Sequence, residues 1–353
     1  MSGNRPRKFS EAKLREIIKL WNGDEDSLEF LGGSNNTLYS FKAGGKGLVL
    51  RLSKISYRTE SKIQAELDWI KYLARKGVSV CPPVPSGNDK LIETVRRPRQ
   101  GVSLATVFIK AAGKPVDPRN RTIWNTTLFQ KWGRTLGRIH KHSKSFKCRA
   151  GYRPPDLDGD AIISLAQRTL PKAEREARKL LETYWQEISN LPKDRESYGL
   201  IHGDLNRCNF VYGNGRLTVF DFDDSSYFWY IYDITVILYV TFLVVQDLGI
   251  RKRRAIVKNF FSHFMFGYQA ENHLGREWIE RLPQFLNFFD VLVFMSFFQK
   301  GHVKTDSDLV KYARTNLGNN DRWSCLDFGR LYDKVLKERK TARLVKKSTA
   351  KGR

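Results

Sequence analysis

The sequence predicts an α+β fold of two lobes: a small N-terminal lobe with an antiparallel sheet plus one helix, and a large, mainly helical lobe. The length of 353 residues exceeds what one hydrophobic core usually holds. Short apolar segments between glycine turns fill the first part of the chain, and longer segments with helical spacing fill the rest. We therefore expect a small lobe over 1–109, a large lobe over 110–335 and a basic tail over 336–353.

The small lobe is expected to begin with three strands. Apolar and β-branched patterns place them at 29–33, 37–42 and 48–52. The second and third strands are joined by the turn 43–46, Ala-Gly-Gly-Lys. An antiparallel sheet follows from these short connections.

The loop between the first two of these strands reads GGSNNT over residues 32–37. Its small residues would let backbone N–H groups approach phosphate oxygens. Gly33, Ser34 and Asn36 are therefore candidate nucleotide-binding residues. A glycine-rich turn is also common in a plain hairpin, and that alternative stays open.

A helix is predicted over about 59–76, ending at Gly77, with Ile63, Leu67, Ile70 and Leu73 at helical spacing. Glu66 borders its buried face and is a natural partner for Arg51 on the third strand. Arginine presents a planar fork of five donors, so Arg51 could pair with Glu66 and also hold nucleotide phosphates. The alternative is an arginine at a strand edge with its charge in water.

A second pair of strands is expected at 91–95 and 104–109, followed by a helix over about 120–143. His140 lies near the end of that helix, and we interpret it as a packing residue rather than a catalyst. Farther along, Asp233 precedes an apolar helix. It could cap that helix or brace the preceding loop.

The clearest signal is HGDLNRCN over 202–209, followed by a hairpin and then DFDD over 221–224. Asn214-Gly215 favours a tight turn because these residues readily adopt positive φ. A two-residue loop would pair Asn209 with Phe220, and a three-residue loop would pair it with Val219. The three-residue register would also place Asn209 and Asp221 on one face.

Carboxylates and an amide at this spacing suit phosphoryl transfer. Mg²⁺ takes oxygen ligands and usually only a few from the protein, which Asn209 and Asp221 could supply. Asp204 lies before the hairpin and is left to accept the proton of a substrate hydroxyl. The alternative is that each residue is only a turn former or a cap.

This pattern resembles the aminoglycoside phosphotransferase and choline kinase superfamily, whose hallmark is HGDxxxxN followed by a DFxD-like element on a protein-kinase-like fold. The resemblance implies that Asp204 is the catalytic base and that Asn209 and Asp221 bind Mg²⁺. It also implies that Asp223 could reach a second ion.

The segment 108–113 resembles the hinge between the lobes of that fold, where backbone groups, including those of Lys110, would bind adenine. Arg51 departs from the lysine of protein kinases. The segments ELDW over 66–69, PPVPS over 82–86 and FDFDDS over 220–225 are similar to the branch that contains stress-response and homoserine-kinase-like proteins.

The predicted function is ATP- and Mg²⁺-dependent transfer of the γ-phosphoryl group to a hydroxyl of a small metabolite. One alternative is a Ser/Thr protein kinase of the stress-response type, although no APE segment follows Asp224. Another is a non-catalytic kinase-like protein that binds a polyanion. No readable motif identifies the acceptor.

The net charge of +25 arises from 62 Lys and Arg against 37 Asp and Glu. A protein this basic attracts polyanions nonspecifically, and the attraction weakens with salt. The basic background also disfavours a cationic acceptor, and with it an antibiotic-resistance role.

A cytoplasmic protein without a membrane segment is expected. The N-terminus is polar and basic, without the apolar core of a secretory signal. The apolar run 234–245 is too short to span a bilayer, and 285–298 is interrupted by Asn287 and Asp290. The four cysteines lack metal-binding spacing and fit reduced thiols.

Overall fold

The computed structural model describes residues 9–33, 36–56, 58–97, 101–245, 248–299, 307–318, 323 and 326–351. The chain divides into two compact units. The first comprises 1–114, 146–154 and 211–223, and the second comprises 115–145, 155–210 and 224–353. The predicted α+β class is confirmed, since the first unit contains an antiparallel sheet and the second is mainly helical. The predicted lobe boundaries at 109 and 335 stay predictions.

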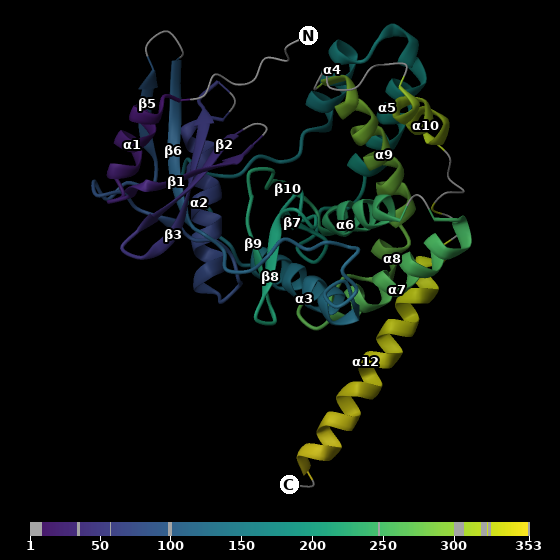
Figure 1. Ribbon diagram of the computed structural model, residues 1–353. Coiled ribbons are helices and arrows are strands. Elements are labelled where there is room, and N and C mark those ends of the chain that lie inside the picture. The colour runs from purple at the N-terminus through teal and green to yellow at the C-terminus, as the bar shows by residue number, and fades with distance from the viewer. Residues whose placement is uncertain are drawn as a thin grey trace. The chain divides into compact units, whose positions relative to one another are not determined.

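The sheet of the first unit has the order β1-β2-β3-β6-β4, with β5 also paired to β6, and every pairing is antiparallel (Figure 1). Gly44 and Gly45 turn between β2 and β3 at φ values of 54° and 75°, which glycine adopts without strain. The strands are β1 (Asp24–Gly32), β2 (Asn36–Ala43), β3 (Lys46–Lys54), β4 (Pro83–Val84), β5 (Glu93–Arg97) and β6 (Gly101–Ile109).

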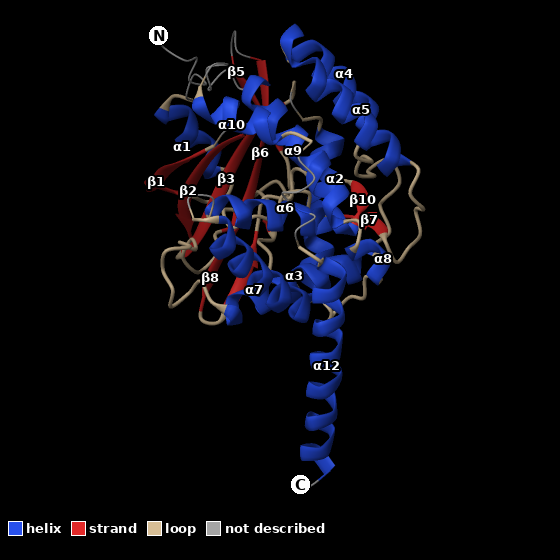
Figure 2. Ribbon diagram, turned by 90° about the vertical axis from the view of Figure 1, so that its right-hand side faces the viewer, coloured by secondary structure: helices blue, strands red, loops and turns tan. Residues whose placement is uncertain are grey.

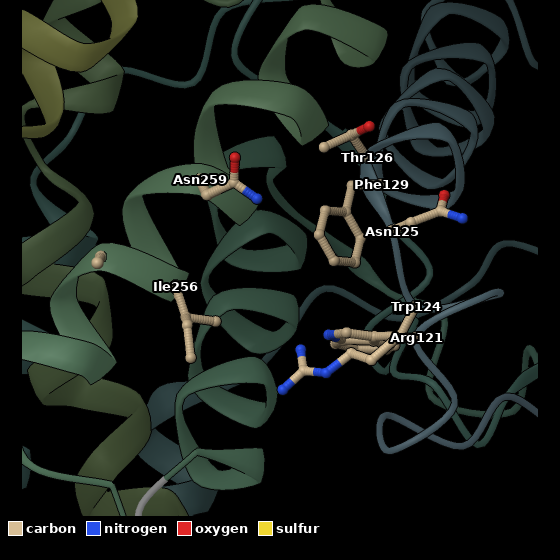
Figure 3. Close-up of a pocket in the computed structure, with 8 residues that line it drawn as sticks. Arg121, Trp124, Asn125, Thr126, Phe129, Ile256 and Asn259 are labelled. Atoms are coloured by element: carbon tan, nitrogen blue, oxygen red, sulfur yellow. The ribbon is translucent and has the colours of Figure 1, made fainter.

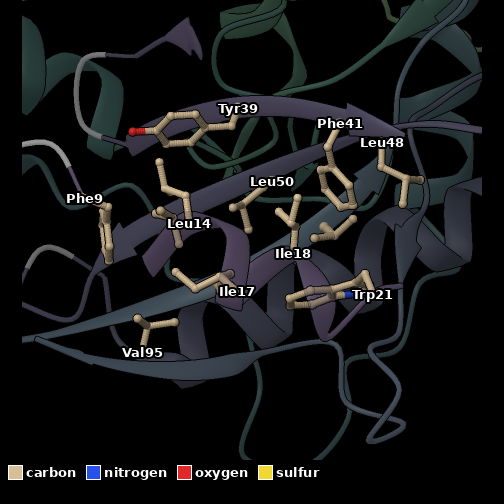
Figure 4. Close-up of a cluster of buried hydrophobic side chains, with 13 residues drawn as sticks. Phe9, Leu14, Ile17, Ile18, Trp21, Tyr39, Phe41, Leu48, Leu50 and Val95 are labelled. Carbon is tan, nitrogen blue, oxygen red and sulfur yellow. The ribbon is translucent and has the colours of Figure 1, made fainter. Parts of the chain in front are cut away.

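Helices α1 (Glu11–Lys19) and α2 (Glu60–Arg75) pack against this sheet through different sets of side chains. The patterns above did not predict α1, although Ser10 caps its first turn by accepting from the N–H of Lys13. Figure 4 shows its apolar side chains packed on the sheet. The cluster includes Leu14, Ile17, Ile18, Tyr39, Phe41, Leu48, Leu50 and Leu52.

Strand alternation then decides which residues face α2. Leu50 and Leu52 of β3 pack with α1, so Arg51 between them points to the opposite face of the sheet. On that face Leu104 packs with Ile63 and Leu67 of α2. The period of two in β3 and the helical period in α2 therefore direct Arg51 toward α2.

The second unit is built mainly from helices, with a two-stranded sheet of β7 and β10 (Figure 2). Its α3 begins later than the predicted residue 120, because Asn125 caps it by accepting from the N–H groups of Thr127 and Leu128. The described elements are α3 (Thr126–Ser143), α4 (Gly159–Thr169), the 3₁₀ helix η1 (Lys172–Glu174), α5 (Arg175–Ser189), β7 (Tyr198–Leu200), β10 (Tyr227–Trp229), α6 (Tyr230–Val244), α7 (Ile250–Tyr268), α8 (Arg276–Ile279), α9 (Leu282–Gln299), α10 (Asp308–Asn316) and α12 (Phe328–Lys351).

Glycines bring α3 and α7 into close contact. A Cβ at Gly133 would lie 1.8 Å from the carbonyl oxygen of Phe264, and one at Gly267 would lie 1.9 Å from that of Gln130. No side chain fits at either position, so the two helices approach backbone to backbone. This packing anchors the long helix that carries His140.

One helical run, Arg276–Gln299, is long and apolar enough to cross a membrane by length and composition alone. Half of its most apolar window is buried, and α9 contacts α5 and α6 inside the second unit. A core helix accounts for the same pattern. The predicted cytoplasmic location without a membrane segment stays a prediction.

The hairpin after the HGDLNRCN segment consists of β8 (Phe210–Gly213) and β9 (Arg216–Val219). Its loop has two residues, Asn214 and Gly215, both at positive φ, as a type I′ turn requires. The two-residue alternative is therefore correct. The three-residue register, which was the basis for placing Asn209 and Asp221 on one face, is not adopted.

Helix α12 occupies most of the predicted basic tail. The Phe328 ring lies 5.1 Å from that of Phe261, and Arg339 donates a hydrogen bond to the carbonyl oxygen of Phe266. Beyond this contact the helix extends away from the other helices of its unit (Figure 1).

Candidate active site

Arg51 and Glu66 form a buried ion pair in the first unit. Arg51 donates from Nη1 to Oε1 and from Nη2 to Oε2, both at 2.7 Å, and the two side chains are 5% and 3% exposed. Burial lowers the pKa of Arg51, but the charge and hydrogen bonds of Glu66 outweigh it and raise the pKa. The alternative of a solvated arginine is therefore wrong. Within the described residues, Nε of Arg51 is buried without a hydrogen-bond partner.

A second arginine joins this pair. Nη1 of Arg58 lies 2.9 Å from Oε2 of Glu66 and 4.0 Å from Oδ2 of Asp223. Asn36 donates to the same Oδ2 at 3.0 Å and accepts from the Ser53 hydroxyl at 2.7 Å. The side chain of Asn36, predicted to bind nucleotide, thus contacts Asp223.

Asp221 and Asp223 lie at the other end of this network, and each affects the pKa of the other. Burial of the carboxyl group, followed by the negative charge of Asp223, raises the pKa of Asp221 to about 8. The residue as a whole is nevertheless exposed to solvent. Burial opposes ionisation of Asp223, but Asp221 and the guanidinium groups of Arg51 and Arg58 lower its pKa. Asp221 also has a φ of 65°, which is rare for residues other than glycine. The two guanidinium groups balance Glu66 and Asp223, so ionisation of Asp221 would add a negative charge that neither arginine neutralises.

In the second unit, Asp204 is held by two amides of its own loop. Asn206 donates to Oδ1 at 2.8 Å, and Asn209 donates to Oδ2 at 2.9 Å and to the Asp204 carbonyl oxygen at 2.8 Å. Burial raises the pKa of Asp204, and these hydrogen bonds act in the opposite direction. The structure therefore brings Asp204 and Asn209 together and holds the carboxylate by amide hydrogen bonds.

Asp233 lies in the first turn of α6 and braces this loop rather than capping the helix. Its carboxylate accepts from the N–H groups of His202 at 2.9 Å and Gly203 at 2.8 Å, and it contacts Nε2 of His140 at 2.9 Å. Nδ1 of His140 lies 2.9 Å from the Tyr268 hydroxyl. Burial lowers the pKa of His140, so a neutral imidazole bridges the two groups. The expected packing role of His140 agrees with this geometry.

The remaining predicted residues belong to the first unit. Gly33 has a φ of 125°, and a Cβ there would lie 2.0 Å from the carbonyl oxygen of Asn36, so the loop requires glycine. Ser34 lies outside the described residues. The N–H of Lys110 already donates to the carbonyl oxygen of Gly47 at 2.9 Å, so this donor is not available to adenine.

Sequence reasoning missed Arg58 and Ser53. Arg58 lies between a strand and a helix and looks like a surface loop residue, yet it is buried. Ser53 lies two positions after Arg51 on β3 and therefore shares its face. That spacing is the one signal that could have placed Ser53 beside Arg51.

Residues 27–271 match the phosphotransferase enzyme family, which is most of the chain. The chain belongs to this family. The predicted family and the predicted phosphotransferase class are thereby confirmed. The assignment to a stress-response or homoserine-kinase-like branch stays a prediction.

Two relatives of this phosphotransferase extend over nearly its whole length. Amicoumacin kinase of Bacillus subtilis (strain 168) is 29% identical over 326 residues, covering 91% of this chain and 96% of the relative. The solved amicoumacin kinase hAmiN, in complex with AMP-PNP, Ca²⁺ and Ami, is 27% identical with a TM-score of 0.82, covering 90% and 95%.

A more distant structure supports the fold. The microcompartment-associated aminopropanol kinase has a TM-score of 0.71 at 21% identity, covering 91% of this chain and 99% of that one. The kinase-like architecture of the phosphotransferase is therefore confirmed independently of its motifs.

A pocket of about 340 Å³ lies in the second unit between the start of α3 and α7 (Figure 3). Trp124, Phe129 and Ile256 give it apolar walls, and Arg121 and Asn259 add polar groups. The predicted site residues of the phosphotransferase are not among those that line it. No residue of the 202–209 loop is among the residues that line this pocket.

Proposed function

We propose that this phosphotransferase moves the γ-phosphoryl group of ATP to a hydroxyl of a small molecule, with Mg²⁺ as the metal. The observation that carries the proposal is the Asp204 carboxylate, fixed by two loop amides in the HGDLNRCN segment. A carboxylate positioned in this way can accept the proton of an attacking hydroxyl. Catalysis would otherwise consist of positioning and charge stabilisation.

The donor groups fit a nucleotide phosphate and a divalent cation. Among the described residues, Nε of Arg51 is a buried donor without a hydrogen-bond partner. A phosphate oxygen could accept a hydrogen bond from this group. A bound cation would favour the ionised form of Asp221, whose pKa is raised to about 8 in its absence, and Asn209 and Asp221 present the oxygen-bearing groups that Mg²⁺ prefers. When bound, the cation would neutralise charge on the transferring phosphoryl group. The AMP-PNP and Ca²⁺ complex of the solved relative supports this assignment.

A small acceptor is favoured over a protein. Amicoumacin kinase and aminopropanol kinase each match about nine-tenths of this chain, and their names specify small molecules. A panel of hydroxylated metabolites, with amicoumacin and aminopropanol among them, would be tested against a generic protein acceptor with radiolabelled ATP. Labelling of the protein alone would favour the Ser/Thr kinase alternative.

The test of the metal and nucleotide assignment uses Asp221. Asp221→Ala is expected to abolish Mg·ATP-dependent turnover with the fold retained, because a cation ligand is lost. Asp221→Asn tolerates the positive φ and separates loss of charge from backbone strain. Asp26→Ala, at a carboxylate that is 92% exposed in the same unit, is the control and should leave turnover unchanged. Full activity of Asp221→Ala would contradict the proposal.

The polyanion alternative has one supporting observation. Along α12, Arg330, Lys334, Lys337 and Lys340 are exposed. We expect weak binding of a fluorescent single-stranded RNA that falls steeply with salt. Lys337→Glu with Lys340→Glu should weaken it, whereas the same changes at Lys62 and Lys71 of α2 should weaken it less. Absence of binding at low salt would contradict this alternative.

A further inference from the structure

Arg58 is a buried group that lies close to both halves of the charged network in the first unit. Its side chain is 9% exposed and its Nη1 lies between Glu66, at 2.9 Å, and Asp223, at 4.0 Å. Glu66 is the partner of Arg51, and Asp223 lies two residues after the predicted metal ligand Asp221.

The environment of Arg58 determines its position. Its backbone N–H donates to the carbonyl oxygen of Lys54 at 3.0 Å, and Thr59 next to it caps α2 by accepting from the N–H of Lys62. The arginine is therefore held at the junction where β3 ends and α2 begins. Because Nη1 lies near both carboxylates, a movement of the guanidinium group toward one of them changes its distance to the other.

The charges explain why this junction needs a cation. Glu66 accepts three hydrogen bonds, two from Arg51 and one from Arg58, so two guanidinium groups share one carboxylate. Asp223 receives the surplus positive charge together with a hydrogen bond from Asn36 at 3.0 Å. The order of Asp223 thus depends on the same arginine that holds Glu66.

We propose that Arg58 is a positioning residue that couples the Arg51–Glu66 pair to the Asp221–Asp223 segment, so that the binding of nucleotide phosphate and of the divalent cation reinforce each other. The inference rests on the proposed function, since it assigns phosphate to Arg51 and the cation to Asp221. Ordering either end orders the other through Glu66, Arg58 and Asp223. Such coupling is reciprocal, because each ligand changes the affinity for the other by the same factor.

The test measures this factor directly. ADP binding is followed by calorimetry with and without Mg²⁺, and Mn²⁺ binding by electron paramagnetic resonance with and without ADP. In the unaltered enzyme, each ligand should tighten the other. Arg58→Met should reduce the coupling factor about tenfold, and Arg58→Lys should restore part of it.

Two further variants keep the test independent of folding. Asn36→Ala removes the second support of Asp223 and should also reduce the factor, without removing a buried charge. Arg149→Met is the matched control, because Arg149 pairs with Asp68 of the same helix α2 at 3.6 Å but is 57% exposed. It should leave the factor unchanged.

The outcomes separate the inference from the proposed function. If the unaltered enzyme binds neither ADP nor Mn²⁺, the proposed function is wrong, and this inference with it. If the unaltered enzyme shows coupling and folded Arg58→Met, Arg58→Lys and Asn36→Ala retain it in full, the inference alone is wrong. If only the affinity for ADP falls while the coupling factor stays constant, Arg58 is a phosphate-binding or structural residue and the inference is again wrong.

Discussion

The two units stabilise their buried carboxylates in different ways. In the first, Glu66 is neutralised by the guanidinium groups of Arg51 and Arg58. In the second, Asp233 accepts two backbone N–H bonds and contacts a neutral imidazole. Both side chains are almost completely buried, at 3% and 0% exposed. The same chemical group thus serves a charge network in one unit and a backbone brace in the other.

The difference follows from what each unit must do. In the first unit, burial and then the charge of Asp223 raise the pKa of Asp221, whereas Asp221 and the two arginines lower that of Asp223 against the effect of burial. Backbone donors hold a loop in place without adding a charge that would compete with the reaction. The first arrangement suits the binding of charged ligands, and the second suits the presentation of Asp204.

The largest effect is expected where the braced loop presents its carboxylate. Asp204→Asn should lower kcat by about 10²- to 10⁴-fold, because the amide cannot accept a proton. Steady-state kinetics would measure the loss, and calorimetry would verify that the fold is retained. Glu182→Gln, at an exposed position of α5, is the control. A loss of only a few-fold would show that the loop positions something other than a base.

Unequal costs are expected when each buried carboxylate becomes an amide. Glu66→Gln should destabilise the protein by about 3–5 kcal/mol, because two buried guanidinium groups lose their counter-charge. Asp233→Asn should cost about 1–3 kcal/mol, since an amide leaves part of its three contacts unsatisfied. Urea unfolding would compare them. Equal costs would contradict the distinction between a charge network and a brace.

The brace should also make stability depend on pH. Burial lowers the pKa of His140 in the folded state, so below the ordinary histidine pKa of about 6.5 the unfolded chain binds the extra proton. Stability should fall as pH drops below about 6.5, by at most about 1.4 kcal/mol per pH unit for this group. The pKa of Asp233 is lowered too, so its stabilisation persists through this range and is lost only at lower pH.

His140→Gln is the variant that isolates this slope from the other histidines. The difference in unfolding free energy between it and the unaltered protein should shrink as pH falls through this range. A constant difference would mean that the pKa of His140 is the same in the folded and unfolded states, and a difference that grows would mean that protonated His140 pairs with Asp233 as an ion.

The smallest effect is expected at the surface of α2. Arg149→Met breaks an ion pair with Asp68 that is partly exposed to solvent, so it should cost no more than about 1 kcal/mol and leave kcat unchanged. Thermal unfolding and steady-state rates would measure both. A loss of stability as large as that of Glu66→Gln would mean that solvent exposure does not make the Arg149–Asp68 pair weaker than the buried Arg51–Glu66 pair.

Local patterns predicted much of the site. The period of two in β3 and the helical period in α2 were enough to pair Arg51 with Glu66, at a sequence separation of 15. The HGDLNRCN segment likewise contained both Asp204 and Asn209, five residues apart. Where both partners lie within one or two neighbouring elements, spacing alone brings them together.

Other contacts had no local signal. Helix α1 has a capping serine and three buried apolar residues, but it is short and its mean composition is polar. The choice between capping and bracing for Asp233 required knowing that His140, 93 residues earlier, reaches the same carboxylate. The length of the loop after β8 depended on the φ values of Asn214 and Gly215, since both alternatives fit the same letters.

The sequence by itself determined the fold class, the reaction class and the candidate residues, because these depend on periodicity and on motifs that lie within a few residues of each other. Only the tertiary structure decided which partners they take. Asn36 and Asp223 are 187 residues apart, and Arg58 bridges Glu66 to that same Asp223. A buried charge takes whichever counter-charge the packing of distant segments brings within hydrogen-bond distance, and no local pattern records that choice.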